Sequence, residues 1–240
     1  MAAVHGAFEW GGIFIGVRLY LRAGRISLAE LGRTRHFAVV LGCVLGAALG
    51  NKAVHWIHHA ERWPMLVDAP WLVLQGQSIV GGLLGGLIGV EVGKRIAGVK
   101  ESTGDRFVLP ILVGLSVGRI GCFIAGLQDD TFGNPTTMPW GVDFGDGIAR
   151  HPTQLYECAF VLALGLLLRA NERRFPRAGD RFRWYMIAYL MFRFAIEFIK
   201  PIPQEYVFGL SGIQLLCLAG LIHYHRAIAD LRTALAWERR

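Results

Sequence analysis

The chain has little charge and no paired cysteines. Only 18% of its 240 residues are charged, whereas 53% are hydrophobic, and soluble domains carry about a quarter of charged residues. Its cysteines are scattered singly, without the paired spacing of a disulfide framework or a zinc site, at Cys43, Cys122, Cys158 and Cys217. Low-complexity linkers and fixed-period repeats are also missing. These absences exclude a soluble domain, a disulfide scaffold and a repeat protein, and they predict one integral membrane domain over 1–240.

What the sequence does contain is a series of long apolar runs. Seven approach the roughly 20 residues that a bilayer requires, at 4–21, 37–57, 78–97, 107–125, 154–169, 184–199 and 207–224. We therefore predict an all-α, polytopic membrane protein with seven transmembrane helices. The start of the chain has no basic region followed by a small-residue cleavage site, so we expect the first helix to be retained.

The basic residues are distributed unevenly between these runs. Loops 22–36, 94–106 and 169–183 and the C-terminal tail hold most of the 25 lysines and arginines. The opposite loops hold few basic residues and several aspartates. The positive-inside rule therefore places the N-terminus outside and the C-terminus in the cytoplasm. This distribution accounts for the net charge of +7 without any nucleic-acid partner.

Arg119 lies deep inside the apolar run 107–125, and Arg193 lies inside the run 184–199. A charge in the hydrocarbon costs about 3 kcal/mol or more, so it marks a functional site by default. A buried guanidinium needs an anion, and lipid phosphates are abundant at that depth. The alternative is that Arg193 and Glu197, at i and i+4, neutralise each other. That alternative leaves Arg119 unexplained, so we predict an anionic phospholipid as partner.

The predicted topology places most other intramembrane polar residues in the outer half. Arg193, Glu197 and Lys200 lie at i, i+4 and i+7 and so form one stripe that rises about 10 Å. Further polar residues at the same depth are Lys52, Gln77, Ser78, Gln154 and Glu157.

The block His151-Pro152-Thr153-Gln154-Leu155-Tyr156-Glu157 stands at the start of the fifth run. Proline is common at the first helical position, so free backbone N–H groups and the positive end of the helix dipole would face the outer leaflet. His151 is then a candidate general acid or base, or else an interfacial packing residue. The outer loop 126–153 before it is the longest connection, and loops of that length are usually functional or disordered.

Two glycine series and one histidine group allow more than one interpretation. Gly81, Gly85 and Gly89 follow small-xxx-small spacing, as do Gly42, Gly46 and Gly50, and the absence of a following Lys-Ser/Thr pair favours helix packing over a phosphate loop. His55, His58 and His59 have helical spacing suited to a metal, but no carboxylate partner is evident, which favours an interfacial helix end. We expect no metal and no cofactor.

Four blocks, at 118–126, 151–157, 193–201 and 209–214, resemble the successive blocks of the prolipoprotein diacylglyceryl transferase family. The resemblance runs in order from the first helix to the last. It implies a transferase in the bacterial cytoplasmic (inner) membrane, with its active site in the outer-leaflet half. The reaction would move a diacylglyceryl group from phosphatidylglycerol to the lipobox cysteine of a secreted lipoprotein precursor and release glycerol 1-phosphate.

The same resemblance implies residue roles. Arg119 and Arg193 would hold the lipid phosphate and stabilise the charge that develops on it, because fixed cations need no reorganisation. Glu157 and Glu197 would orient the arginines. The catalytic candidates are Arg119, Arg193, His151 and Glu197. The candidates for substrate binding are Lys52, Gln77, Ser78, Gly133, Gln154, Tyr156, Glu157 and Lys200.

The chain departs from the family pattern at several positions. Val80 stands where the family has a histidine regarded as catalytic, and a valine accepts no proton. Cys122 and Ala125 replace asparagines, Trp10 replaces a tyrosine, and 126–133 contains two extra residues. One hypothesis is a divergent enzyme that uses His151 as its base; the other is a phospholipid-binding protein without catalysis or with another specificity. A transporter would show inverted repeats with broken helices, and none is convincing.

Overall fold

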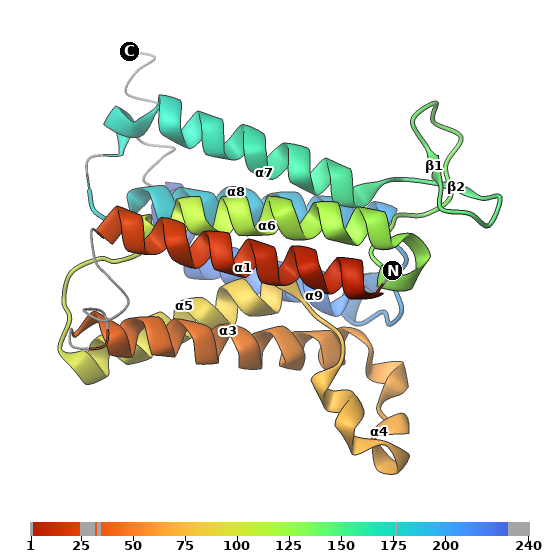
Figure 1. The fold of residues 1–240 in the computed structure, drawn as a ribbon, viewed down its shortest axis with the longest axis horizontal. Coiled ribbons are helices and arrows are strands. Elements are labelled where there is room, and N and C mark those ends of the chain that lie inside the picture. The colour runs from red at the N-terminus through yellow and green to blue at the C-terminus, as the bar shows by residue number, and fades with distance from the viewer. Residues whose placement is uncertain (1, 25–31, 33–34, 176, 230–240) are drawn as a thin grey trace. The chain divides into compact units, whose positions relative to one another are not determined.

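The computed structural model describes residues 2–24, 32, 35–175 and 177–229. Nearly all regular structure is helical (Figure 1), with α1 (Ala2–Gly24), α3 (His36–His58), α4 (Met65–Asp68), α5 (Ile79–Ala97), α6 (Asp105–Ala125), α7 (Thr153–Ala170), α8 (Asp180–Ile196) and α9 (Gly212–His223). Short 3-10 turns include η3 (Gly126–Asp129), η5 (Glu197–Ile199) and η6 (Val207–Gly209). β1 (Val142–Asp143) and β2 (Ala149–Arg150) pair antiparallel in the outer loop. The predicted helical class is confirmed.

Three described helical stretches are long and apolar enough to cross a membrane: His36–His58, Asp105–Asp129 and Thr153–Ala170. Gly212–His223 is apolar but shorter. A multi-pass helical membrane protein is therefore supported, while the seven spans and the orientation of the termini stay predictions.

The boundaries of two predicted helices are wrong. The run 207–224 becomes α-helical only at Gly212, because Phe208 has a left-handed φ of 60°. Ser211 then caps α9 by accepting a hydrogen bond from Gln214 N. The run 184–199 starts earlier, at Asp180, and its last three residues form η5.

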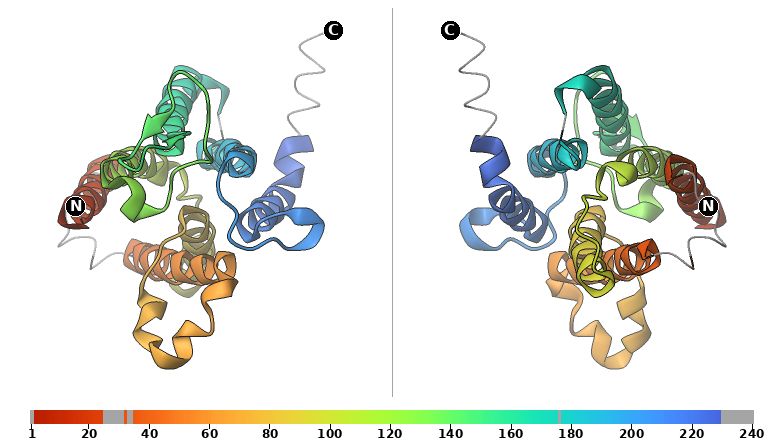
Figure 2. Two further views of the ribbon diagram at one scale, coloured as in Figure 1. Left: turned by 90° about the vertical axis from the view of Figure 1, so that its right-hand side faces the viewer. Right: turned by 90° about the vertical axis from the view of Figure 1, so that its left-hand side faces the viewer.

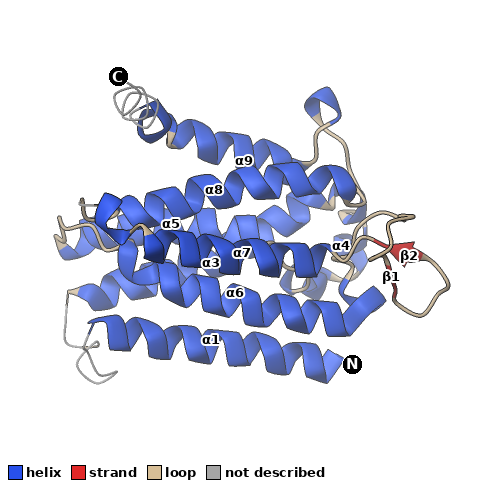
Figure 3. Cartoon of the chain, turned by 90° about the horizontal axis from the view of Figure 1, so that it is seen from above, coloured by secondary structure: helices blue, strands red, loops and turns tan. Residues whose placement is uncertain are grey.

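The chain divides into two compact units, and the single domain over 1–240 stays a prediction. The first unit comprises Met1–Leu28, Ser102–Tyr189 and Phe198–Pro201. In it α1 lies beside α6, and α6 beside α7 (Figure 3). A Cβ on Gly12 would lie 2.9 Å from the Gly114 carbonyl oxygen, so glycine permits close approach of α1 and α6. Asp105 on α6 accepts backbone hydrogen bonds from Gly179 and Phe182 and so fixes the start of α8.

The second unit comprises Ala29–Glu101, Leu190–Glu197 and Ile202–Arg240. Helices α3 and α5 pack directly against each other, as the end-on views show (Figure 2). A Cβ on Gly46 would lie 2.2 Å from the Gly85 carbonyl oxygen, and one on Gly50 would lie 2.3 Å from that of Gly81. No side chain fits at that separation, so the predicted close packing of the two glycine series is confirmed. We call this contact the glycine interface.

Candidate functional site

Arg119 lies toward the end of α6 in the first unit, with 6% of its surface exposed. Its Nη2 is 2.7 Å from Glu157 Oε2 on α7. Glu157 Oε1 accepts a 2.6 Å hydrogen bond from the Tyr189 hydroxyl of α8. Gln154 lies one helical turn before Glu157 and is also buried. We call these four residues the Arg119 cluster.

The Arg119 cluster contains polar atoms without a partner. Within the described residues, Arg119 Nε and both side-chain amide atoms of Gln154 are buried and make no hydrogen bond. Among the same residues Arg119 Nη1 makes only a 3.8 Å contact with Cys122 Sγ. Glu157 supplies the anion that a buried guanidinium requires, so charge alone does not call for a lipid phosphate. The unpaired N–H groups do call for an acceptor, because buried donors are almost always satisfied.

The first turn of α7 anchors the outer loop. The helix begins at Thr153 with Pro152 as its N-cap residue, one position later than the proline signal predicts. Thr153 Oγ1 donates to the Thr131 carbonyl oxygen at 2.7 Å, and Lys200 Nζ donates to the same oxygen at 2.8 Å. Lys200 follows η5 and so does not continue the regular helical stripe that its spacing predicts.

Gly133 and His151 meet in the same loop. Gly133 N donates to the His151 carbonyl oxygen at 2.9 Å. A Cβ on Gly133 would lie 2.6 Å from His151 Cβ and 2.8 Å from the Ile199 carbonyl oxygen, so the position requires glycine. His151 Nδ1 is 3.2 Å from the Tyr156 hydroxyl, which accepts a 2.7 Å hydrogen bond from Trp140 Nε1. Three predicted site residues, Gly133, His151 and Tyr156, thus lie together.

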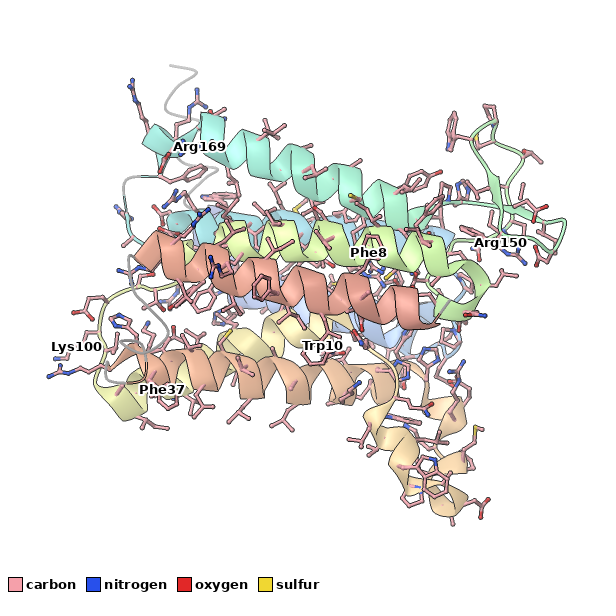
Figure 4. All side chains as sticks on the ribbon, viewed as in Figure 1. Phe8, Trp10, Phe37, Lys100, Arg150 and Arg169 are labelled. Carbon is pink, nitrogen blue, oxygen red and sulfur yellow. The ribbon has the colours of Figure 1, made fainter. Side chains whose placement is uncertain are left out.

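The β1–β2 ribbon carries an ion pair between Arg150 and Asp146, with Nη1 to Oδ1 at 2.7 Å. The hydrogen bond from Arg150 holds the pKa of the Asp146 carboxyl below its ordinary value. Arg150 also lies over the Phe132 ring, 5.0 Å from its centroid. In Figure 4 Arg150 and Arg169 lie at opposite ends of α7. The Arg150–Asp146 ion pair therefore joins two parts of the ribbon just before α7 begins.

Arg193 belongs to the second unit, near the end of α8, and is also buried. Its Nη1 donates a short hydrogen bond to Glu197 Oε2. Glu197 Oε1 accepts from Ser211 Oγ at 3.2 Å and faces His58 Nε2 at 3.6 Å. Gln214 Oε1 in turn accepts from Ser211 N at 2.8 Å. We call these five residues the Arg193 cluster.

The remaining predicted site residues lie around the start of α5 in the second unit. Lys52 Nζ donates to the Gly76 carbonyl oxygen at 2.7 Å, and Ser78 Oγ caps α5 by accepting from Gly81 N. Gln77 is exposed and makes no side-chain hydrogen bond within the described residues. Val80 is fully buried. Lys52 and Ser78 therefore have structural partners that account for them without a ligand.

Sequence reasoning missed Tyr189, His58, Ser211 and Gln214 as site residues. Tyr189 lies four residues before Arg193 on α8, but the two residues belong to different units. Spacing along α8 therefore does not predict that Tyr189 bonds to Glu157, which lies on α7. Ser211 and Gln214 follow the capping-box spacing S-x-x-Q, a signal that was available. His58 was assigned to an interfacial helix end, and no local pattern places it against Glu197.

The helices and the two arginine clusters define a membrane-embedded protein that holds each buried arginine against a buried carboxylate. The chain belongs to the prolipoprotein diacylglyceryl transferase family, whose model matches residues 3–228. It is 33% identical over 230 residues to the phosphatidylglycerol–prolipoprotein diacylglyceryl transferase of Geobacter sulfurreducens, covering 87% of this chain and 83% of that protein. The enzyme of the same name from Nitratidesulfovibrio vulgaris is 35% identical, and the match covers 86% of this chain and 80% of that protein. The enzyme of that name from Bordetella bronchiseptica is 31% identical, and the match covers 84% of this chain and 80% of that protein.

Proposed function

We propose that this chain transfers a diacylglyceryl group from phosphatidylglycerol to the cysteine thiol of a secreted lipoprotein precursor. The sulfur forms a bond to the terminal glyceryl carbon, and the bond from that carbon to the phosphate oxygen breaks. The electron pair stays on the phosphate oxygen, so glycerol 1-phosphate leaves. The thiol proton passes to a base and then to this product.

The observation that carries the proposal is the unpaired set of donors in the Arg119 cluster. Arg119 Nε and the Gln154 amide are buried, and among the described residues they have no hydrogen-bond partner, whereas Arg119 Nη2 is paired with the Glu157 carboxylate. A phosphate oxygen is an acceptor that satisfies such donors, and a charge-assisted bond there is about twice as strong as a neutral one. Glu157 and Tyr189 hold the guanidinium in place, so it stabilises the leaving phosphate without reorganising.

Arg193 is proposed as the second cation of the reaction. It is fixed by Glu197, which is fixed in turn by Ser211. A planar guanidinium carries five N–H donors, so it can bind a carboxylate and a phosphate oxygen at the same time. Lys200, Tyr156 and Gly133 shape the loop over the headgroup in this proposal.

The thiol proton needs an acceptor other than residue 80, because a valine side chain accepts no proton. Two histidines are candidates for this base. His151 is the first candidate: its ring contacts the Tyr156 hydroxyl beside the loop that holds Gly133. His58 is the second, and the observation that favours it is its position 3.6 Å from Glu197, which is bonded to Arg193. A neighbouring carboxylate can orient the ring of a histidine that accepts a proton.

We further propose an inner-membrane location with both clusters in the outer-leaflet half. The positive-inside distribution of lysine and arginine supports this orientation. The substrates would then be a phospholipid of the membrane and a precursor that has been exported.

The experiment incubates the purified full-length chain with phosphatidylglycerol labelled in its acyl chains and in its headgroup glycerol. A lipobox peptide with cysteine is the acceptor, and the same peptide with serine is the control. We expect acyl label on the cysteine peptide only, and one headgroup label released as glycerol phosphate for each peptide modified. Headgroup label on the peptide, or no release while lipid binds, would contradict transfer and select the lipid-binding hypothesis.

The base is identified from the pH profiles of His151→Gln and His58→Gln. In the parent the rate should rise with pH, because the base must be neutral to accept the thiol proton. The variant that loses this rise while still binding phosphatidylglycerol identifies the base. An unchanged profile in both variants would contradict both assignments.

A further inference from the structure

In addition to the two arginine clusters, the protein has a cluster of potential metal ligands, which lies in the first unit. His5 on α1, Cys122 on α6 and Asp129 at the end of η3 each offer one donor atom, and these atoms all lie within 4.8 Å of one another. In the part of the chain that the structure describes, no other three histidine, cysteine or acidic side chains meet this way. All three are half-buried, so they are not an exposed acidic patch.

The imidazole of His5 is oriented like that of a metal ligand. Its Nδ1 lies 3.3 Å from Asp129 Oδ1 and is buried, yet it makes no hydrogen bond in the part of the chain that the structure describes. Its other nitrogen, Nε2, is 3.2 Å from Glu9 Oε1, one turn along α1. Metal-bound histidines usually donate their second N–H to a carboxylate, which fixes the ring and its tautomer. Glu9 occupies that outer position.

The other two ligands are also held by neighbours. Asp129 Oδ2 accepts a short hydrogen bond from Thr131 Oγ1, which leaves Oδ1 directed at His5. Arg119 Nη1 lies 3.8 Å from Cys122 Sγ and so helps to fix the orientation of that side chain. A thiolate and a carboxylate together balance the charge of a divalent ion.

We propose that His5 Nδ1, Cys122 Sγ and Asp129 Oδ1 bind one divalent transition-metal ion of the zinc type. Mixed nitrogen, sulfur and oxygen donors suit such ions, with bonds of about 2.0–2.3 Å. Tetrahedral bonds of that length put the donor atoms roughly 3–4 Å apart. His5 Nδ1 and Asp129 Oδ1 are already 3.3 Å apart, and the other separations, which are at most 4.8 Å, need to shorten by about 1–2 Å at most. Three protein ligands leave the fourth position for water.

The ion joins α1 to the end of α6, next to the Arg119 cluster. It reverses the sequence-based expectation of no metal, because His5 and Cys122 are too far apart in the chain for any spacing motif to connect them. The proposal does not rest on transferase activity, so either can fail without the other.

The test loads cobalt(II) into the purified full-length chain after chelator treatment. We expect one cobalt per chain, a sulfur-to-cobalt charge-transfer band and the visible absorption of a tetrahedral ion, all displaced by one equivalent of zinc. Cys122→Ser should abolish the charge-transfer band, and His5→Gln should weaken binding strongly. Glu9→Gln, which alters only the outer carboxylate, should weaken it by about 10- to 100-fold.

Cys158→Ser is the matched control, because Cys158 is another free, half-buried cysteine of the same unit. It should bind cobalt like the parent. Zinc should raise the melting temperature of the parent and of Cys158→Ser but not that of Cys122→Ser, while all three melt alike without metal. A cobalt spectrum without the sulfur band, or one that Cys122→Ser leaves unchanged, would overturn the site.

Discussion

At the scale of single residues, the buried pair of Arg119 and Glu157 contributes both to the stability of the fold and to the proposed reaction. Arg119→Met should lower the free energy of unfolding by about 3–5 kcal/mol, because it leaves the Glu157 carboxylate buried and unpaired. Arg119→Met/Glu157→Gln should recover most of that loss, since a neutral amide still accepts the Tyr189 hydroxyl. Denaturation in detergent micelles, followed by tryptophan fluorescence, measures both. Equal stability of the single and double variants would show that the pair is not coupled.

Gln154 gives a second residue-scale prediction, because its amide is buried without a partner. Gln154→Leu should raise the free energy of unfolding by about 1 kcal/mol or more, since it removes an unsatisfied polar group. It should also raise KM for phosphatidylglycerol. Gln214→Leu is the control: its amide bonds Ser211 N and the Phe194 carbonyl, so the same change should destabilise. A Gln154→Leu protein that is less stable, with KM unchanged, would assign Gln154 to packing alone.

At the scale of elements, the glycine interface should tolerate no methyl group where the backbones touch. A Cβ on Gly85 would lie 2.2 Å from the Gly46 carbonyl oxygen, whereas one on Gly82 meets nothing closer than 3.9 Å. Gly85→Ala should therefore destabilise by about 1–3 kcal/mol. Gly82→Ala should be neutral or stabilise by up to about 1 kcal/mol, because alanine favours the helix. Melting curves compare the two, and a Gly85→Ala protein as stable as the parent would refute the interface.

The sequence was sufficient for elements that depend on local pattern and insufficient for contacts between elements. Apolar runs predicted the main helices, and small-xxx-small spacing predicted the glycine interface. The pairing of Arg193 with Glu197 follows from i, i+4 spacing, whereas that of Arg119 with Glu157 joins two helices and came only from the family resemblance. The late start of α9 depends on the left-handed φ of Phe208, a conformation that its residue type does not favour.

At the scale of the whole molecule, the orientation of the chain remains to be tested. In a background whose native cysteines are replaced by alanine, Asp143→Cys should react with an impermeant thiol reagent added to intact cells, and Arg177→Cys should not. Both positions are exposed. Both should react once the membrane is permeabilised, which controls for reactivity. The reverse pattern would place both arginine clusters in the cytoplasmic half.

In the proposed reaction a fixed Arg119 guanidinium stabilises the phosphate that leaves phosphatidylglycerol. The most direct measurement is the initial rate of peptide modification by Arg119→Met/Glu157→Gln and by the parent in phosphatidylglycerol vesicles, both confirmed as folded. Loss of a preorganised cation should lower kcat by roughly 10²-fold or more, whereas the affinity for phosphatidylglycerol should change little. A folded double variant that modifies the peptide at the parent's rate would show that Arg119 does not stabilise the leaving phosphate.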